Sequence, residues 1–230
     1  VQERVCRPGG ESVVLFQAPG GFGKTTLMLQ VMDGLRAQGV TTTWLTVDAA
    51  DNDVGRFLAF LDASFDKLLS GVAPGTEPEN DVAAGVIALD LMERIACTPA
   101  PFVLFVDDAE SLQNAASLAV LRQVIENLPE GCRVVIGSRT MLDIGAPRLL
   151  ARGQLLVIEP MHLRFSVAET GDYLRDKRGL NVPGADIARL QGATEGWPVA
   201  LWLAWLALER SERSVELVSH FSGSNALVAD

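Results

Sequence analysis

The sequence is poor in histidine, cysteine and tyrosine, the side chains from which many metal, redox and acid–base sites are built. Its 230 residues include 2 His, 3 Cys and 1 Tyr. Cys6, Cys97 and Cys132 are widely spaced without metal-ligand spacing, and His162 and His220 also lie far apart. We therefore expect free thiols in a reducing compartment and no histidine- or cysteine-based metal centre.

Basic residues are also scarce. The chain has 19 Lys and Arg against 29 Asp and Glu, which gives a net charge of −10 and a pI near 4.7. Such a surface repels phosphate backbones, so the chain alone is not expected to bind DNA or RNA broadly. Any bound nucleotide has to be held by a local positive site.

The sequence lacks a hydrophobic run long enough to cross a membrane. Its most apolar stretch, Val199 to Leu208, has half of the ~20 residues that a spanning helix needs. The first residues, Val1 to Arg4, contain no signal-peptide core. The hydrophobic fraction of 48% instead indicates a large core. We expect a soluble cytoplasmic chain that has no membrane partner.

A glycine-rich loop follows an apolar run and precedes a helical pattern. The run is Val13 to Phe16, and the helical pattern extends from Leu27 to Gln38. Strand, glycine loop, Gly-Lys-Thr and helix is the arrangement of a phosphate-binding loop (Walker A). Ala18 stands where the first glycine of this motif is usual, and we expect the loop to tolerate the small replacement. The predicted nucleotide-binding residues here are Pro19, Gly20, Gly21, Phe22, Gly23, Lys24, Thr25 and Thr26.

These residue types suit the binding of a nucleoside triphosphate with Mg²⁺. A loop with little side chain lets backbone N–H groups point at phosphate oxygens, and the helix start adds further N–H groups. Lys24 is expected to reach the β- and γ-phosphates, and the Thr25 hydroxyl is expected to be a Mg²⁺ ligand.

Further short apolar runs predict a parallel sheet. They lack alternation, which is typical of strands buried on both faces and covered by helices. Helical 3/4 spacing separates them, notably in Val54 to Leu69 and Leu118 to Leu128, while Val82 to Ala96 is apolar nearly all round and suggests a sandwiched helix. The fold class is therefore α/β with helices flanking the sheet. The predicted strands are Thr42 to Val47, Phe102 to Val106, Val134 to Ile136 and Leu155 to Ile158.

The strand pattern ends near Pro160, and helical patterns follow. A capping box, Ser166 to Glu169, begins a helix that runs toward Arg178. Asp186 to Glu195 predicts a second helix, and Pro198 begins a third. We predict a nucleotide-binding domain at 1–160, a small all-helical domain at 161–220 and the start of another domain at 221–230. Residues 73–81 predict a loop, and Trp44, Trp202 and Trp205 are expected in the core.

Two acids end the predicted strand Phe102 to Val106. Asp107 is expected to hold Mg²⁺, directly or through water, which is the role of a Walker B aspartate. Asp108, the next residue, is the candidate general base that polarises an attacking water. A strand that ends in two acids is often only a turn, but its combination with the Gly-Lys-Thr loop favours the catalytic interpretation.

Arg139 follows the strand Val134 to Ile136 and is the second candidate catalytic residue. If its strand lies between the loop strand and the Asp107 strand, its guanidinium can sense the γ-phosphate. The alternative is a solvated arginine. Four polar residues follow another strand, where they either cap the helix at Val54 or line the nucleotide cleft, and capping is favoured; they are Asp48, Asp51, Asn52 and Asp53.

With these motifs, the chain resembles the signal-transduction ATPases with numerous domains (STAND), and within them the large maltose-activator-type transcriptional regulators with a LuxR-like helix-turn-helix. The motifs that match cover nearly the whole chain. They are Ala18–Leu27, Trp44–Asp48, Asp51–Asp53, Arg56–Phe57, Phe105–Asp108, Gly137–Arg139, Leu163–Ser166 and Glu195–Leu201.

The resemblance implies a sheet in the order 5-1-4-3-2 and a helical lid domain. It implies that Pro198 lies against the adenine of ATP or ADP and that the chain is part of a longer protein. The implied function is a slow ATPase that acts as a switch. ATP would favour self-association of the full-length protein, and DNA would be bound only by a C-terminal domain absent from these residues.

Two other functions share the phosphate loop. One is a small-molecule kinase, against which the acidic 73–81 segment argues, because a kinase lid needs basic residues. The other is a scaffold that holds ADP without hydrolysing ATP. The sequence leaves open which signal is sensed and which genes are controlled.

Overall fold

The computed structural model describes residues 1–230 except 8, 71–83, 99, 180–181 and 210–230. The described chain divides into two compact units. The first consists of Val1–Pro19 and Lys24–Glu159, and the second of Gly20–Gly23 and the residues from Pro160 onward. The loop predicted at 73–81 and the domain start predicted at 221–230 lie outside the described residues.

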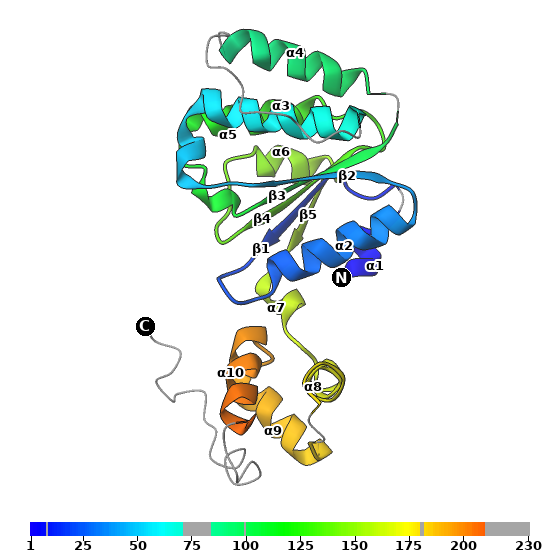
Figure 1. Ribbon diagram of the computed structural model, residues 1–230, viewed down its shortest axis with the longest axis vertical. Coiled ribbons are helices and arrows are strands. Elements are labelled where there is room, and N and C mark those ends of the chain that lie inside the picture. Colours follow the sequence, from blue (N-terminus) through cyan, green and yellow to red (C-terminus); the bar gives the residue numbers. More distant parts are fainter. Residues whose placement is uncertain (8, 71–83, 99, 180–181, 210–230) are drawn as a thin grey trace. The chain divides into compact units, whose positions relative to one another are not determined.

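The first unit is built on a five-stranded parallel sheet with the order β2-β3-β4-β1-β5 (Figure 1). This confirms the predicted α/β class and the order 5-1-4-3-2, which is the same order counted from the other edge. The strands are β1 (Val13–Gln17), β2 (Thr41–Thr46), β3 (Phe102–Asp107), β4 (Arg133–Ser138) and β5 (Leu155–Ile158).

Burial along the strands follows their positions in the sheet. Every residue of the internal strands β3 and β4 is buried, whereas the edge strand β2 alternates between buried and exposed positions. Continuous apolar sequence therefore marks strands whose two faces are both covered, which here include the edge strand β5 as well as the internal strands. All four strands predicted beyond the first are present, with ends shifted by at most two residues.

Helices cover both faces of the sheet. In Figure 1, α1 and α2 lie on one side, and α3, α5 and α6 lie on the other. The sequence patterns did not predict α1 or α6. The helices of this unit are α1 (Gln2–Val5), α2 (Lys24–Ala37), α3 (Val54–Ser70), α4 (Ala84–Ala96), α5 (Ala115–Glu126) and α6 (Ala146–Ala151), with 3-10 turns η1 (Ala49–Asn52) and η2 (Ala109–Ser111).

Helix α3 supplies much of the core on its side of the sheet. Its Phe57, Leu58, Leu61 and Phe65 are at most 2% exposed, as the 3/4 spacing predicted. Each such side chain contributes about 1.5–3 kcal/mol by leaving water. The Phe65 ring meets the Phe102 ring of β3 edge to face, with centroids 5.2 Å apart, so the helix is fixed on the sheet by shape as well as by burial.

Helix α4 lies outside α3 in Figure 1 and is not sandwiched, so that prediction is wrong. Leu91 and Ile95 are fully buried, but Leu89 on the same helix is 75% exposed. The charged residues Asp90, Glu93 and Arg94 are spaced three and four positions apart on one side of this helix, a polar face that the prediction did not take into account. Its inner face packs on α3 and α5, and the rest contacts solvent.

The second unit contains short helices that follow β5. The capping box at Ser166 and Glu169 is present at the start of α8, as predicted, and α9 and α10 correspond to the two later predictions. The elements are α7 (Pro160–Leu163), α8 (Val167–Asp172), a π-helix η3 (Tyr173–Lys177), α9 (Gly184–Thr194) and α10 (Pro198–Glu209).

A small apolar core joins these helices. Leu174, Leu190 and Ala204 are 1% exposed, and Tyr173 and Trp205 pack against them. The expectation that the tryptophans are core is met in part, because Trp205 and Trp44 are half-buried. It is wrong for Trp202, which is 39% exposed, since α10 is apolar on every side and its sequence does not select a face.

None of the described helices combines the length and the hydrophobicity that crossing a membrane requires. Cys6, Cys97 and Cys132 are free thiols.

Candidate functional site

The phosphate loop links the end of β1 to the start of α2. Its first residue, Ala18, is 1% exposed and donates its backbone N–H to the Ser138 carbonyl at 3.1 Å. Gly21 and Gly23 both have φ near +75°, a conformation that side-chain-bearing residues rarely adopt. Ala18 does not have the positive φ that would favour glycine at this position, whereas glycine stands at two positions where the backbone requires it.

Lys24 is the first residue of α2 and lies at the carboxyl end of the sheet. Its Nζ donates to the Ala18 carbonyl at 2.7 Å and to the Pro19 carbonyl at 3.2 Å, and the residue is only 8% exposed. Burial lowers the pKa of the ammonium, while the Glu110 carboxylate acts in the opposite direction. The lysine is held inside the loop by carbonyl oxygens, a role that phosphate oxygens can take over. Thr25 and Thr26 follow it and are exposed.

The tip of the loop packs on the beginning of α10, within the second unit. The Val199 N–H donates to the Gly21 carbonyl at 3.2 Å, and the Phe22 and Trp197 rings stack with centroids 5.9 Å apart. A Cβ on Gly21 would lie 2.8 Å from the Cβ of Val199, so glycine is also required here by close approach. Pro198, predicted to contact adenine, is the first residue of α10, between these two partners of the loop.

The indole N–H of Trp197 is buried and has no hydrogen-bond partner among the described residues. Trp197 and Val199 were not predicted from the sequence as loop partners. The signal was present in their position beside Pro198 in the Glu195–Leu201 motif.

Asp107 ends β3 and is 2% exposed. Its Oδ1 is buried without a hydrogen-bond partner in the described structure. Because a buried carboxylate oxygen needs a partner, a cation ligand is a good fit for this atom. Within the described ranges, no cluster of three or more His, Cys, Asp or Glu side chains is arranged to hold a metal. A Mg²⁺ held by Asp107 would thus take further ligands from Thr25, phosphate and water.

Asp108 has an unusual backbone conformation. Its φ of 54° and ψ of 33° place it in the left-handed region, directly before η2. Aspartate tolerates this region better than most residues, and such conformations concentrate at functional sites. Burial, then the Asp107 and Glu110 carboxylates, raise the pKa of Asp108 above its ordinary value. A raised pKa brings a carboxylate closer to the range useful for a general base.

Arg139 follows β4 and pairs with Glu110, a residue that no sequence motif marked as part of the site. The Arg139 Nε lies 2.8 Å from Glu110 Oε1, and the Arg139 backbone N–H donates to Oε2 at 3.1 Å. Arg139 also repels Lys24 electrostatically, whereas Glu110, Asp107 and Asp108 attract it. The first unit therefore brings the predicted residues Lys24, Asp107, Asp108 and Arg139 together at the carboxyl edge of the sheet, where open α/β sheets bind ligands.

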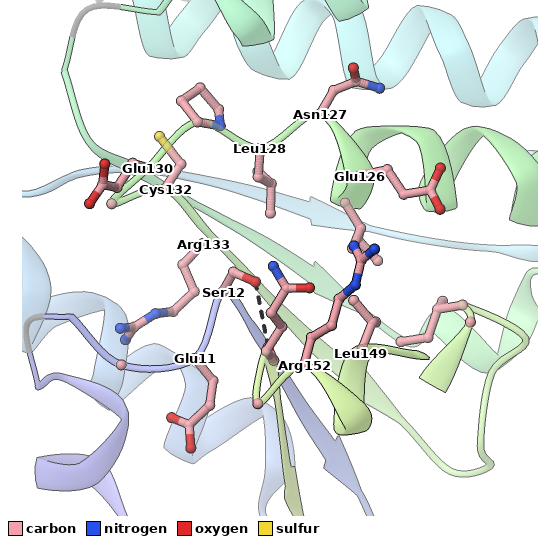
Figure 2. A pocket seen from close by; sticks show the side chains of 18 of the residues that line it. Glu11, Ser12, Glu126, Asn127, Leu128, Glu130, Cys132, Arg133, Leu149 and Arg152 are labelled. Carbon is pink, nitrogen blue, oxygen red and sulfur yellow. Dashed lines mark hydrogen bonds between the residues drawn. The ribbon is translucent and has the colours of Figure 1, made fainter. Parts of the chain in front are cut away.

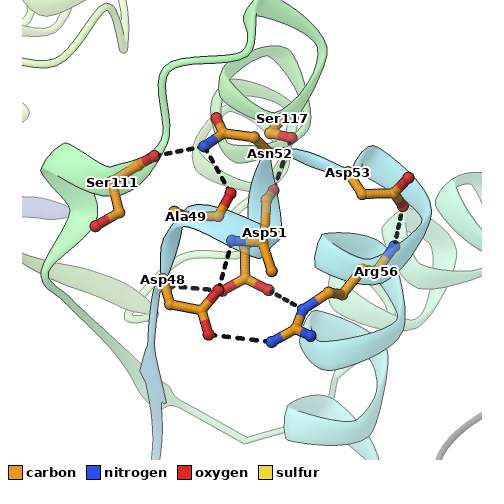
Figure 3. Close-up of polar contacts among 9 residues, drawn as sticks. Asp48, Ala49, Asp51, Asn52, Asp53, Arg56, Ser111 and Ser117 are labelled. Atoms are coloured by element: carbon orange, nitrogen blue, oxygen red, sulfur yellow. Dashed lines mark hydrogen bonds and ion pairs between the residues drawn. The ribbon is translucent and has the colours of Figure 1, made fainter.

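Asn52 ties the loop after β2 to the loop after β3, as Figure 3 shows in part. Its Nδ2 donates to the Ala49 and Ser111 carbonyls at 3.0 and 2.8 Å, and its Oδ1 accepts from the N–H groups of Gln113 and Asn114, both at 2.7 Å. The amide thus uses both its donors and both its acceptor positions. This fixes the segment that carries Asp108 and Glu110.

The aspartates after β2 serve as caps, but only Asp53 caps the helix at Val54, as the favoured alternative predicted; Asp48 and Asp51 cap the preceding 3-10 turn. Asp48 and Asp51 form a reciprocal capping box around η1, and Asp53 Oδ1 accepts from the Arg56 N–H at 2.8 Å in the first turn of α3. Arg56 also pairs with Asp51 at 3.0 Å and Asp48 at 3.1 Å (Figure 3). The three carboxylates are engaged in this local network rather than in a nucleotide cleft.

A cavity of about 700 Å³ lies at the opposite, amino end of the strands (Figure 2). Glu11, Ser12, Arg133 and Arg152 line it, together with the Glu126–Arg148 ion pair, whose atoms are 2.9 Å apart. None of the predicted site residues lines this cavity. We place the candidate site at the carboxyl edge, because the phosphate loop is there. The cluster of Lys24, Asp107, Asp108 and Arg139 is there too, and none of these residues lines the cavity.

Comparison with known proteins finds relatives of the chain in sequence and in structure. No family model matches the chain. In sequence, the chain is similar to the serine/threonine-protein kinase PknK of Mycobacterium tuberculosis, with 28% identity over 229 residues that cover 97% of this chain and 21% of that protein. It is also similar to the HTH-type transcriptional regulator MalT of Klebsiella pneumoniae, with 26% identity over 219 residues that cover 93% of this chain and 24% of that protein.

The chain therefore spans about a fifth to a quarter of the length of these curated relatives. In structure, it is similar to AMPPCP-bound DnaA from Aquifex aeolicus, with a TM-score of 0.56, 14% identity and coverage of 96% of this chain and 63% of that chain. It is similar to the ORC2 protein of Aeropyrum pernix in ADPNP–ADP complexes, with a TM-score of 0.56, 16% identity and coverage of 97% and 66%.

The fold is that of a P-loop NTPase, and the predicted relation to the maltose-activator type of regulator is confirmed.

Proposed function

We propose that this chain is the ATP- and ADP-binding switch module of a signal-responsive bacterial transcriptional activator of the STAND class, with slow Mg²⁺-dependent ATPase activity. The observation that carries the proposal is the cluster of Lys24, Asp107, Asp108 and Arg139 at the carboxyl edge of the sheet, beside a glycine loop that leads into α2. The relation to MalT, whose name describes a transcriptional regulator, supports the regulatory role.

Nucleotide binding uses the loop and the start of α2. The backbone amides of residues 19–26 receive the β- and γ-phosphates, and the Lys24 ammonium exchanges its loop carbonyls for phosphate oxygens. The Thr25 hydroxyl and the Asp107 carboxylate would hold Mg²⁺, which would neutralise charge that develops on the phosphates. Pro198 lies against the adenine in this proposal, since its neighbours Trp197 and Val199 pack on the loop tip.

Hydrolysis uses the residues after β3 and β4. The Asp108 carboxylate accepts a proton from water as the water oxygen bonds to the γ-phosphorus, and the bond from that phosphorus to the β–γ bridging oxygen breaks to give ADP and phosphate. The Arg139 guanidinium stabilises the negative charge on the γ-phosphate oxygens. The raised pKa of Asp108 supports its role as the base.

The purpose of this slow reaction is to reset a switch. A ligand shifts a conformational equilibrium by its differential affinity for the two states, and ATP and ADP differ in the phosphate that Arg139 would sense. In the proposal, ATP favours self-association of the full-length cytoplasmic protein, and ADP favours a monomer. DNA is bound by a part of that protein outside these residues.

The decisive experiment identifies any nucleotide that copurifies and then measures phosphate release with and without candidate acceptors. Slow release to water supports the switch, transfer to a metabolite would establish a small-molecule kinase, and tightly held ADP without turnover would establish a scaffold.

Lys24→Ala is expected to abolish the stabilisation by ATP, which at about 100 times the dissociation constant is roughly 2.7 kcal/mol. The matched control is Lys177→Ala, which removes an exposed lysine of η3. An unchanged ATP-induced melting shift in Lys24→Ala would overturn the phosphate-site assignment.

A further inference from the structure

The Glu110–Arg139 pair joins two strand ends that are 29 positions apart in sequence. Glu110 lies in η2 after β3, and Arg139 follows β4, the neighbouring parallel strand. One carboxylate makes two contacts to the same residue, through the arginine Nε and through its backbone N–H. It therefore fixes both the direction of the side chain and the position of its main chain.

The two partners differ in exposure. The Glu110 side chain is 18% exposed, whereas the Arg139 side chain is 63% exposed. An exposed ion pair normally contributes little to stability, because water screens it and two long side chains lose freedom. Here the acid is mostly buried on a short turn, and the arginine reaches from it toward solvent. Such an arrangement is better suited to aiming the guanidinium than to stabilising the fold.

The segment that carries Glu110 is itself held rigidly. Ala109 is fully buried, and the Ser111 and Leu112 N–H groups donate back to Asp108 and Ala109 at 3.0 and 3.1 Å. Three of the four hydrogen bonds of Asn52 fasten the end of this turn and the residues after it. A carboxylate on so constrained a turn has little freedom to follow the arginine, so the arginine adopts the direction that the acid sets.

We propose that Glu110 is a positioning residue for Arg139: by accepting from Nε and from the backbone N–H, it presents the terminal nitrogens of the guanidinium to the γ-phosphate and so makes the site distinguish ATP from ADP. The inference rests on the proposed function. An arginine has five N–H donors in a planar fork, and a carboxylate on Nε leaves the end with the two terminal nitrogens for a phosphate.

This proposal predicts that removing Glu110 changes the affinity for ATP in the direction opposite to the one that simple electrostatics predicts. Glu110 is an anion beside the candidate phosphate site, and it interacts with Lys24 more strongly than Asp107 or Asp108 does. Removing a negative charge next to a phosphate site should by itself increase the affinity for ATP and ADP. If Glu110 positions Arg139, its removal instead weakens ATP binding, because the guanidinium is no longer aimed.

The experiment compares the dissociation constants of ATP and ADP, each with Mg²⁺, for the wild type, Glu110→Ala, Glu110→Gln, Arg139→Ala and the Glu110→Ala/Arg139→Ala double variant. Arg139→Ala is expected to weaken ATP binding about tenfold, ~1.4 kcal/mol, with ADP binding nearly unchanged. Glu110→Ala is expected to weaken ATP binding about three- to tenfold and to add almost nothing in the double variant. Glu110→Gln, which keeps an acceptor for the backbone N–H, should fall between.

Glu126→Ala is the matched control, because Glu126 also pairs with an arginine, Arg148, at the opposite end of the sheet. It should leave both constants unchanged, and melting temperatures without nucleotide identify any variant that fails to fold. Unchanged or increased ATP affinity in Glu110→Ala, or full additivity in the double variant, would overturn the positioning role. If the wild type binds neither nucleotide, the proposed function fails instead, so the two failures are distinguishable.

Discussion

The Asp107 carboxylate lies directly against the backbone of Gly137 on the neighbouring strand. A Cβ on Gly137 would come within 2.6 Å of Asp107 Oδ1 and 2.7 Å of Met28 Sδ. Glycine within a strand often marks such a close approach. The missing side chain at this position is thus what lets the buried candidate Mg²⁺ ligand occupy the end of β3.

Gly137→Ala is therefore expected to displace Asp107 and to weaken ATP binding about tenfold, a loss of ~1.4 kcal/mol, when Mg²⁺ is present. Overpacking should also lower the free energy of unfolding by about 1–3 kcal/mol. Titrations with Mg²⁺ and with EDTA measure the first effect, and denaturant unfolding measures the second. Gly85→Ala is the control, since no atom of the described residues lies within 4 Å of that Cβ position. A loss of affinity that is equal with and without Mg²⁺ would contradict the role given to Asp107.

Gly196 is fixed by its contact with the segment before α8. Its φ is +70°, and a Cβ there would lie 2.3 Å from the Phe165 carbonyl oxygen. Gly196→Ala is expected to destabilise the protein by about 2–4 kcal/mol, because left-handed strain and a backbone clash add together. Gly192→Ala, in open space on α9, should be neutral or slightly stabilising. Chemical unfolding followed by circular dichroism compares the two, and equal stabilities would show that the backbone relaxes at Gly196.

The capping box of α8 should contribute pH-dependent stability. The Ser166 N–H and hydroxyl donate to Glu169 Oε2, both at 2.8 Å, and the backbone contact, then the hydroxyl contact, lower the pKa of Glu169. The contribution is present above the ordinary glutamate pKa of about 4.3 and is lost as the pH falls through the lowered folded value. Ser166→Ala should cost about 1 kcal/mol at pH 7.

Glu169→Gln keeps an acceptor but cannot titrate, so the acid-induced loss that belongs to this box should disappear in that variant. Urea unfolding from pH 7 to pH 3 measures both effects. Nucleotide affinity in Ser166→Ala serves as the control and should not change. Weaker nucleotide binding in Ser166→Ala would place the serine at the nucleotide site rather than at a helix cap.

The sequence predicted the parts of the molecule that follow from local chemistry. Buried strands such as Phe102–Val106 were predicted from continuous apolar runs. The start of α8 was predicted from the spacing of Ser166 and Glu169, which is that of a capping box. The phosphate loop was predicted from its glycines and Lys24. Each of these depends on residues close together in the chain.

Features that depend on strand order could not be predicted residue by residue. Glu110 reaches Arg139 because β3 and β4 are neighbours, and Gly137 makes room for Asp107 for the same reason. An apolar helix caused a different difficulty: Trp202 belongs to α10, which is apolar on every side, so nothing local indicated that it is exposed. Leu89 lies on α4 with the charged residues Asp90, Glu93 and Arg94, a polar face that the prediction of a sandwiched helix did not take into account.

Asp108→Asn tests the candidate base through stability as well as through hydrolysis. Burial, Asp107 and Glu110 raise the pKa of Asp108 in the folded protein, so its ionised form is disfavoured there. The contribution of this carboxyl group to the free energy of unfolding is fully present below the ordinary aspartate pKa of about 3.9. It decreases as the pH rises through the raised pKa of the folded protein. Asp108→Asn should therefore raise the melting temperature of the nucleotide-free protein at pH 7, and the gain should vanish near pH 3.

The same variant should retain ATP binding within about threefold and lose phosphate release by ~10²- to 10⁴-fold, the usual contribution of general base catalysis. Single-turnover phosphate release and equilibrium binding measure the two quantities on one preparation. Asp143→Asn is a suitable control, since Asp143 is an exposed acid whose side chain is 74% accessible beside Arg122. Unchanged phosphate release in Asp108→Asn would assign the base elsewhere, whereas a lower melting temperature at pH 7 would show that the ionised carboxylate is needed for folding.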